Sequence, residues 1–158
     1  MSSKDVHWVK NLPYSKMVFP NTFSDRTKYI FWWLYTPCHP YIRDILLALR
    51  IVRHEGRQDF LLGKIAPHLT IKEFTHIIIE RGYGNHFVAW KDEGELVSLR
   101  YVENFAFQYH LRVFEDREVR AHYEHTPECF PISHIKQINM EDRRRDFLKI
   151  LGDTIVNQ

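Results

Sequence analysis

The stretch FAFQYHLRVFEDREVRAHYEH, residues 105 to 125, alternates apolar and polar side chains almost without error. Alternation with period two is typical of a half-buried β-hairpin. Matching like faces across a turn at residues 115 to 117 defines one register, because a slip by one residue would turn every apolar side chain outward. The apolar pairs are then Val113–Val119, Leu111–Ala121 and Tyr109–Tyr123. The polar pairs are Arg112–Arg120, His110–His122 and Gln108–Glu124.

The polar face of this hairpin gathers the side-chain types that a metal-independent ribonuclease uses. Such an enzyme needs a base, an acid and fixed positive charge, which His or Glu and Arg can supply. The candidate catalytic residues are His110, His122, Glu124, Arg112 and Arg120. The facing Arg pair would repel, which favours an anion or a carboxylate nearby. The alternative is that this face is simply solvated, as one face of an antiparallel sheet often is.

A second hairpin is predicted just upstream, with strands at residues 86–91 and 95–102 around the turn Asp92-Glu93-Gly94. A three-residue loop that ends in Gly is a common hairpin turn, since the last position needs a positive φ. This hairpin would extend the polar face. The candidate binding residues are His86, Trp90, Arg100 and Gln108.

The preceding sequence predicts helices. Apolar spacing favours helices over residues 41–53, 57–66 and 70–81, and Thr70 with Glu73 forms a capping box for the third. Residues 24–35 are predicted to form a short helix within an aromatic-rich, irregular arm (residues 1–40) that packs on the domain, and a last helix is predicted from a cap at Asn139 through Ile155.

Together these elements predict one α+β domain over residues 1–158. It has a helical N-terminal half in winged-helix-like order, a four-stranded antiparallel β-meander and a C-terminal helix. Helices followed by an antiparallel sheet also resemble the arrangement of small barnase-like and RelE-like ribonucleases. That likeness is one of fold only, since no motif matches.

Composition limits the partners and the compartment. The net charge is only +2, although residues 1–57 carry nine basic and four acidic side chains. The longest apolar run, residues 29–35, is far too short to span a membrane. Two cysteines give no disulfide framework, so we expect a cytoplasmic protein. The spacing of His122, His125, Cys129 and His134 is not a standard zinc pattern, so we expect no metal or other cofactor.

Three functions therefore remain open. The first is RNA cleavage at the polar face. The second is non-catalytic binding of RNA or DNA through the basic first third, although the exposed side of the helix at residues 70–81 is neutral and the DEGE turn is acidic. The third is binding of a protein partner through the aromatic arm.

Overall fold

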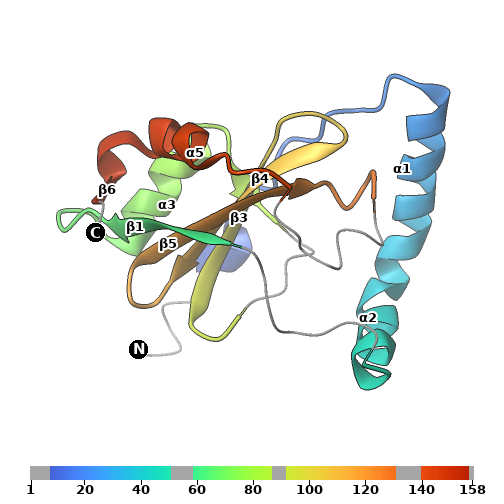
Figure 1. The fold of residues 1–158 in the computed structure, drawn as a ribbon, viewed down its shortest axis with the longest axis horizontal. Coiled ribbons are helices and arrows are strands. Elements are labelled where there is room, and N and C mark those ends of the chain that lie inside the picture. Colours follow the sequence, from blue (N-terminus) through green and yellow to red (C-terminus); the bar gives the residue numbers. More distant parts are fainter. Residues whose placement is uncertain (1–7, 51–58, 87–91, 131–139, 157–158) are drawn as a thin grey trace.

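The structure, a computed structural model, describes residues 8–50, 59–86, 92–130 and 140–156. Its centre is a curled antiparallel sheet with the strand order β2-β3-β4-β5-β1-β6 (Figure 1). The strands are β1 (Phe60–Ile65), β2 (Gly84–Asn85), β3 (Glu95–Val102), β4 (Phe107–Phe114), β5 (Glu118–His125) and β6 (Ile155–Val156).

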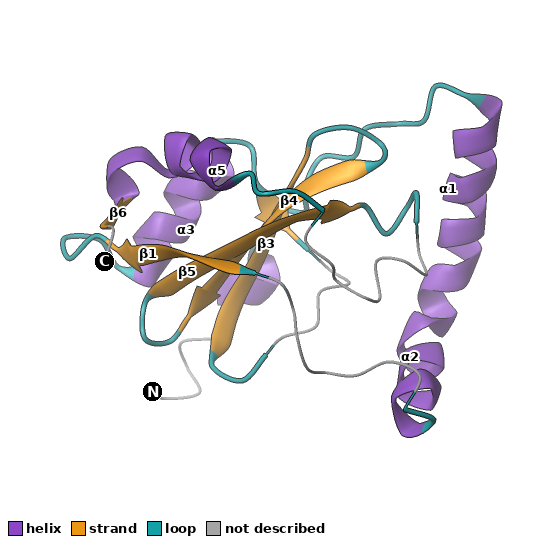
Figure 2. Cartoon of the chain, in the orientation of Figure 1, coloured by secondary structure: helices purple, strands orange, loops and turns teal. Residues whose placement is uncertain are grey.

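The α-helices divide into two groups (Figure 2). They are α1 (Phe23–Tyr35), α2 (His39–Ala48), α3 (Ile71–Glu80) and α5 (Arg144–Leu151). Helices α3 and α5 cover one face of the sheet, whereas α1 and α2 lie at the opposite end of the molecule. These two helices are called the α1–α2 arm below, to distinguish them from the irregular arm predicted over residues 1–40. Within the described part of the chain, no helix is long and apolar enough to cross a membrane.

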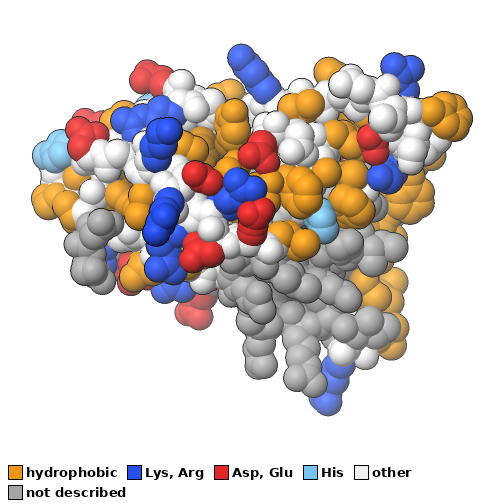
Figure 3. Space-filling model, turned by 45° about the horizontal axis from the view of Figure 1, so that its top comes forward, with side chains coloured by type: hydrophobic (Ala, Val, Ile, Leu, Met, Phe, Trp, Pro, Cys, Tyr) orange, Lys and Arg blue, Asp and Glu red, His pale blue; other side chains and the backbone are white. Residues whose placement is uncertain are grey.

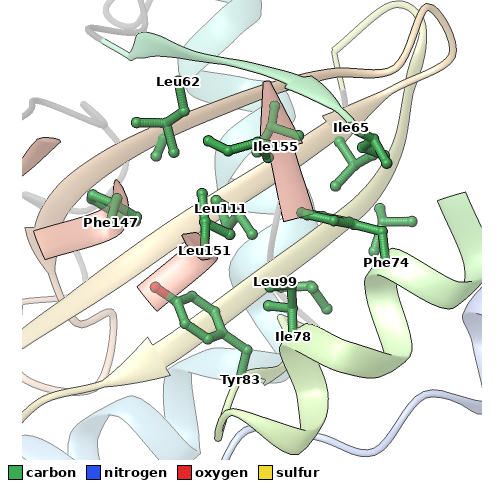
Figure 4. Packing of buried hydrophobic residues seen from close by; sticks show 14 of the residues in the cluster. Leu62, Ile65, Phe74, Ile78, Tyr83, Leu99, Leu111, Phe147, Leu151 and Ile155 are labelled. Carbon is green, nitrogen blue, oxygen red and sulfur yellow. The ribbon is translucent and has the colours of Figure 1, made fainter. Parts of the chain in front are cut away.

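The hydrophobic core lies between the sheet and the helices α3 and α5 (Figure 4). Phe74 and Ile78 of α3 and Phe147 of α5 are fully buried against Leu99 and Leu111 of the central strands. These strand residues alternate with polar ones, so the apolar half of each strand faces the helices. Burial of this face therefore determines which side chains of β3, β4 and β5 point the other way.

The predicted register of the β4–β5 hairpin is confirmed at every pair. Arg117 occupies the turn position that needs a positive φ, with φ 73°, although it is not a glycine. Its guanidinium donates hydrogen bonds to the carbonyl oxygens of Ile65, Ala66 and Leu69, which helps to hold the turn. The capping box of Thr70 and Glu73 is also confirmed.

An α+β fold with an antiparallel sheet is confirmed, but the predicted helical half and four-stranded meander are wrong. The predicted helix at 57–66 contains β1, which pairs with β5 with a bulge between Leu61 and Gly63. The last helix ends at Leu151 and is followed by strand β6, which pairs with β1. With a strand in place of its second helix, the winged-helix order is lost. A short apolar run such as FLLGKI suits either structure, and pairing with β5 decides for the strand.

The N-terminal segment is attached to the edge of the sheet at β2. Asn85 donates its backbone N–H to Pro13, and Ser15 donates its backbone N–H to Asn85. The contact needs a glycine at position 84, because a Cβ there would lie 2.2 Å from the backbone nitrogen of Ser15. This attachment brings Ser15 and Met17 over the polar face of the sheet.

Candidate functional site

The polar face of β3, β4 and β5 is buried rather than solvated. Each of its main side chains is at most 2% exposed: Arg100, Gln108, His110, Arg112, His122 and Glu124. Ser15, Met17 and Glu128 contact this face from the N-terminal segment and from the chain after β5. Burial of so many polar groups is tolerated because they satisfy one another.

His110, His122 and Glu124 form a tight triangle at the centre of this face. The Nδ1 atom of His110 lies 3.1 Å from Nε2 of His122 and 3.2 Å from Oε1 of Glu124. The Nε2 atom of His122 lies 3.2 Å from Oε2 of the same carboxylate. The two ring planes meet edge to face, with centroids 4.7 Å apart. The pairing of β4 with β5 therefore brings two ring nitrogens and one carboxylate to a common point.

His110 also belongs to a hydrogen-bonded chain. Its Nε2 atom lies 2.6 Å from the hydroxyl oxygen of Ser98 on β3, so Ser98, His110 and Glu124 are connected in the order of a nucleophile, a base and an orienting carboxylate. Burial lowers the pKa of His110 to about 3, and the hydrogen bond with Glu124 offsets only part of that effect. The imidazole is therefore neutral at physiological pH, and Ser98, 2% exposed, is closed to a substrate.

Arg100 connects the same face to the chain that covers it. Its guanidinium donates two hydrogen bonds to the carboxylate of Glu128, at 3.1 and 2.9 Å, and one to Ser15. A further bond reaches Gln108, which in turn donates to Glu124 at 2.7 Å. This chain of contacts holds Glu124 in place. Arg100 is therefore paired with a buried carboxylate of its own chain, that of Glu128.

The two facing arginines have different environments. Arg112 is buried among Glu95, Asp59 and Asp92, and it donates to all three carboxylates. Burial alone would lower the pKa of Arg112, but those carboxylates outweigh it and raise the pKa. Arg120 is 42% exposed and pairs with Glu118. Repulsion between the two is therefore relieved by carboxylates, with no need for a bound anion.

The structure brings most of the sequence-predicted site residues together. His86 joins the cluster with its ring edge to face against His110, the ring centroids 5.0 Å apart, and Arg120 alone lies at the exposed border. Trp90 lies outside the described residues. Sequence reasoning missed Ser98, which the alternation of β3 places on the polar face. It also missed Asp59 and Glu128, which only the folded chain brings there.

Burial weighs against RNA cleavage at this face, because a polynucleotide cannot reach His110 or His122 when both are at most 1% exposed. The ribonuclease hypothesis stays a prediction, and the geometry gives it no support.

Helix α1 presents a second candidate surface, and its orientation is unusual. Trp32 is its only buried residue, and Lys28 on the same side contacts Cys129 and lies over the ring of Phe130. At about 100° per residue, the exposed apolar side chains fall within about 160° of arc on the opposite side. They are Phe23, Ile30, Phe31, Trp33 and Leu34. The helix therefore leaves most of its apolar side exposed and turns the side of Trp32 toward the rest of the described chain.

The exposed apolar surface continues beyond α1. Tyr41, Ile45 and Leu49 recur every four residues along α2 and just past its end, and all are exposed. Figure 3 shows hydrophobic side chains along the right-hand edge, where α1 lies, whereas most of the visible Lys, Arg, Asp and Glu side chains lie in the left half of the view. A hollow of about 530 Å³ opens at the base of this arm. Its lining residues are Met17, Tyr29, Trp32, Trp33, Leu34, Thr36, Pro37 and Glu128.

Comparisons of the chain with protein-family models, with curated proteins and with solved structures found no match.

Proposed function

We propose that this protein is a protein-interaction module whose α1–α2 arm docks on a second copy of the same chain. The observation that carries the proposal is the outward-facing apolar side of α1. Eleven of the fifteen exposed large hydrophobic side chains recorded for the described residues lie between Tyr14 and Leu49. An exposed apolar area this concentrated is uncommon on a monomer and usually marks an interface.

The area suits a stable dimer. The exposed apolar side chains of the arm are about two thirds accessible on average. Taking about 200 Å² for each fully exposed one gives roughly 1,000 Å² per chain. A specific interface of standard size buries about 800 Å² per partner. Pairing of two arms can therefore supply the whole interface, and the hollow beside Trp32 offers a place for an aromatic side chain from the partner.

The charge distribution favours a second copy over other occupants. Between Tyr29 and Leu49 the only Asp, Glu, Lys or Arg residues are Arg43 and Asp44. Interfaces of permanent homodimers are depleted of charge in this way, and a twofold axis would use the same surface twice. A membrane surface fits less well, because helices that lie on membranes carry several Lys or Arg on the polar side. In α1, Lys28 is already paired with Asp25.

Sedimentation velocity of the full chain tests this proposal. At about 50 µM we expect a dimer of twice 19.1 kDa. The double variant Ile30→Glu/Leu34→Glu places two charges at the centre of the apolar side of α1 and should sediment as a monomer. The matched control Met140→Glu/Val156→Glu changes two side chains of similar exposure elsewhere and should stay dimeric.

Far-UV circular dichroism must show the same helix and strand content in all three proteins. A monomeric wild-type chain would overturn the proposal, and so would a dimer that survives the arm variant. Flotation with vesicles of phosphatidylcholine and phosphatidylglycerol distinguishes one alternative. Flotation of a monomeric wild-type chain would assign the arm to a membrane surface.

A further inference from the structure

We propose that His110, His122 and Glu124 form a binding site for one divalent transition-metal ion, with zinc as the best fit. This site lies on the buried face of the sheet and does not depend on pairing of the arms. Its members come from two paired strands: His110 lies on β4, and His122 and Glu124 lie on β5. Their possible ligand atoms all lie within 4.8 Å of one another.

The distances agree with those between ligands of a zinc ion. Zn–N and Zn–O bonds of about 2.0 to 2.2 Å in a tetrahedron place neighbouring ligand atoms about 3.3 Å apart. The Nδ1 atom of His110 lies 3.1 Å from Nε2 of His122, and each nitrogen lies 3.2 Å from a different oxygen of Glu124, Oε1 or Oε2. A carboxylate that binds through both oxygens therefore needs only small side-chain movements to accept the ion. Two imidazoles and one carboxylate are a ligand set known for zinc, whereas calcium and magnesium prefer oxygen ligands.

The surrounding contacts support the ligands as outer partners of a metal site do. Ser98 lies 2.6 Å from Nε2 of His110 and can accept that N–H, which leaves Nδ1 with a lone pair facing the ion. Gln108 donates to Glu124 at 2.7 Å and is itself held by Arg100. Metal-binding side chains usually have such partners, which fix their orientation.

The two imidazoles differ in their outer contacts. The side chain of His122 is fully buried, and among the described residues its Nδ1 atom has no hydrogen-bond partner, whereas Nε2 of His110 lies beside Ser98. Neutral imidazole carries one proton, and placing it on Nδ1 leaves Nε2 as a lone-pair donor toward the ion. Without a metal, both rings would instead donate an N–H to Glu124. Rings that offer their lone pairs to an ion should bind zinc, whereas rings that only donate hydrogen bonds to Glu124 should not.

Measuring metal binding to the full chain distinguishes the metal-binding from the purely hydrogen-bonded arrangement of the two imidazoles. After removal of metals with a chelator, zinc chloride is titrated into the protein by calorimetry, and cobalt(II) chloride is added as a visible probe. We expect one ion per chain and the visible bands of four-coordinate cobalt, without a thiolate absorption in the near ultraviolet. His122→Gln and Glu124→Gln should each weaken zinc binding at least about 100-fold, and Ser98→Ala about 10- to 100-fold.

His125→Gln is the matched control. His125 lies on the same strand as His122 and Glu124, but its ring stacks on Phe107 and is not part of the triangle. Its replacement should therefore leave the zinc affinity unchanged. A chain that binds no zinc would overturn the proposal. Binding that persists in Glu124→Gln but fails in His125→Gln would also overturn it, and would assign the ion to the sequence cluster of His122, His125, Cys129 and His134. Circular dichroism of each variant shows whether the protein is still folded, and Ser98→Ala gives a test that leaves all three ligands in place.

Discussion

Replacing Arg112 should cost far more stability than replacing Arg120, although the two residues are cross-strand partners of the same type. The perturbation is Arg→Met at either position, which keeps most of the side-chain volume and removes the charge. Arg112 is 1% exposed and donates to Glu95, Asp59 and Asp92. Its loss leaves a fully buried carboxylate, that of Glu95, without the guanidinium that compensates it.

Breaking a buried ion pair by removing one partner costs about 3 to 5 kcal/mol, because an uncompensated charge stays in a medium of low dielectric constant. Arg120 pairs with Glu118 at 42% exposure, where solvent screening leaves an ion pair worth about 0 to 1 kcal/mol. Both guanidiniums also lie over the ring of Phe114, so that contribution is similar in the two variants.

The assay is urea unfolding followed by far-UV circular dichroism, with all three proteins at one concentration, since self-association makes apparent stability depend on concentration. We expect the free energy of unfolding to fall by about 3 kcal/mol or more in Arg112→Met and by less than about 1 kcal/mol in Arg120→Met. Equal losses in the two variants would refute the assignment of Arg112 as the buried ionic centre.

Two further predictions test the histidine cluster and the N-terminal attachment. In chelator, His110→Gln should gain stability relative to the wild type as pH falls. The folded-state pKa of His110, about 3, lies below the usual 6.5, so the stability that neutral His110 contributes is present above pH 6.5 and falls by roughly 3 kcal/mol by pH 4.5. Parallel stability curves between pH 6.5 and 4.5 would show that His110 is not buried as a neutral ring. Gly84→Ala should detach the N-terminal segment, since its Cβ would overlap Ser15, and hydrogen exchange should become fast at the Asn85 amide, which donates to Pro13. Gly94→Ala, which meets no atom within 4 Å but has φ 75°, should cost only about 1 kcal/mol and leave that amide protected.

Local patterns predicted local structure well. The alternation of residues 105 to 125 was enough to predict six of the seven cross-strand pairs, because only one register places every apolar side chain on one face. The capping box at Thr70 is equally local, since its two hydrogen bonds join residues three apart. The same alternation placed His110, His122 and Glu124 on one face, so most of the candidate site could be found from the sequence.

The long-range arrangement of the elements could not be predicted from the sequence. Strand β1 consists of a short apolar run that also suits a helix, and only its pairing with β5 and β6 decides the matter. The sequence left open whether the polar face is a site or is simply solvated, because alternation shows which side chains share a face and does not show what covers that face. Glu128 and Ser15 approach Arg100 from 28 and 85 residues away along the chain, and Asp59 approaches Arg112 from 53 residues away.

The sequence by itself therefore determined the hairpin, its register and the residues that share its polar face. The tertiary structure alone decided that this face is buried and paired, and that the apolar side of α1 points outward. The physical reason is that periodicity is a property of neighbouring residues, whereas burial depends on which distant segments pack together.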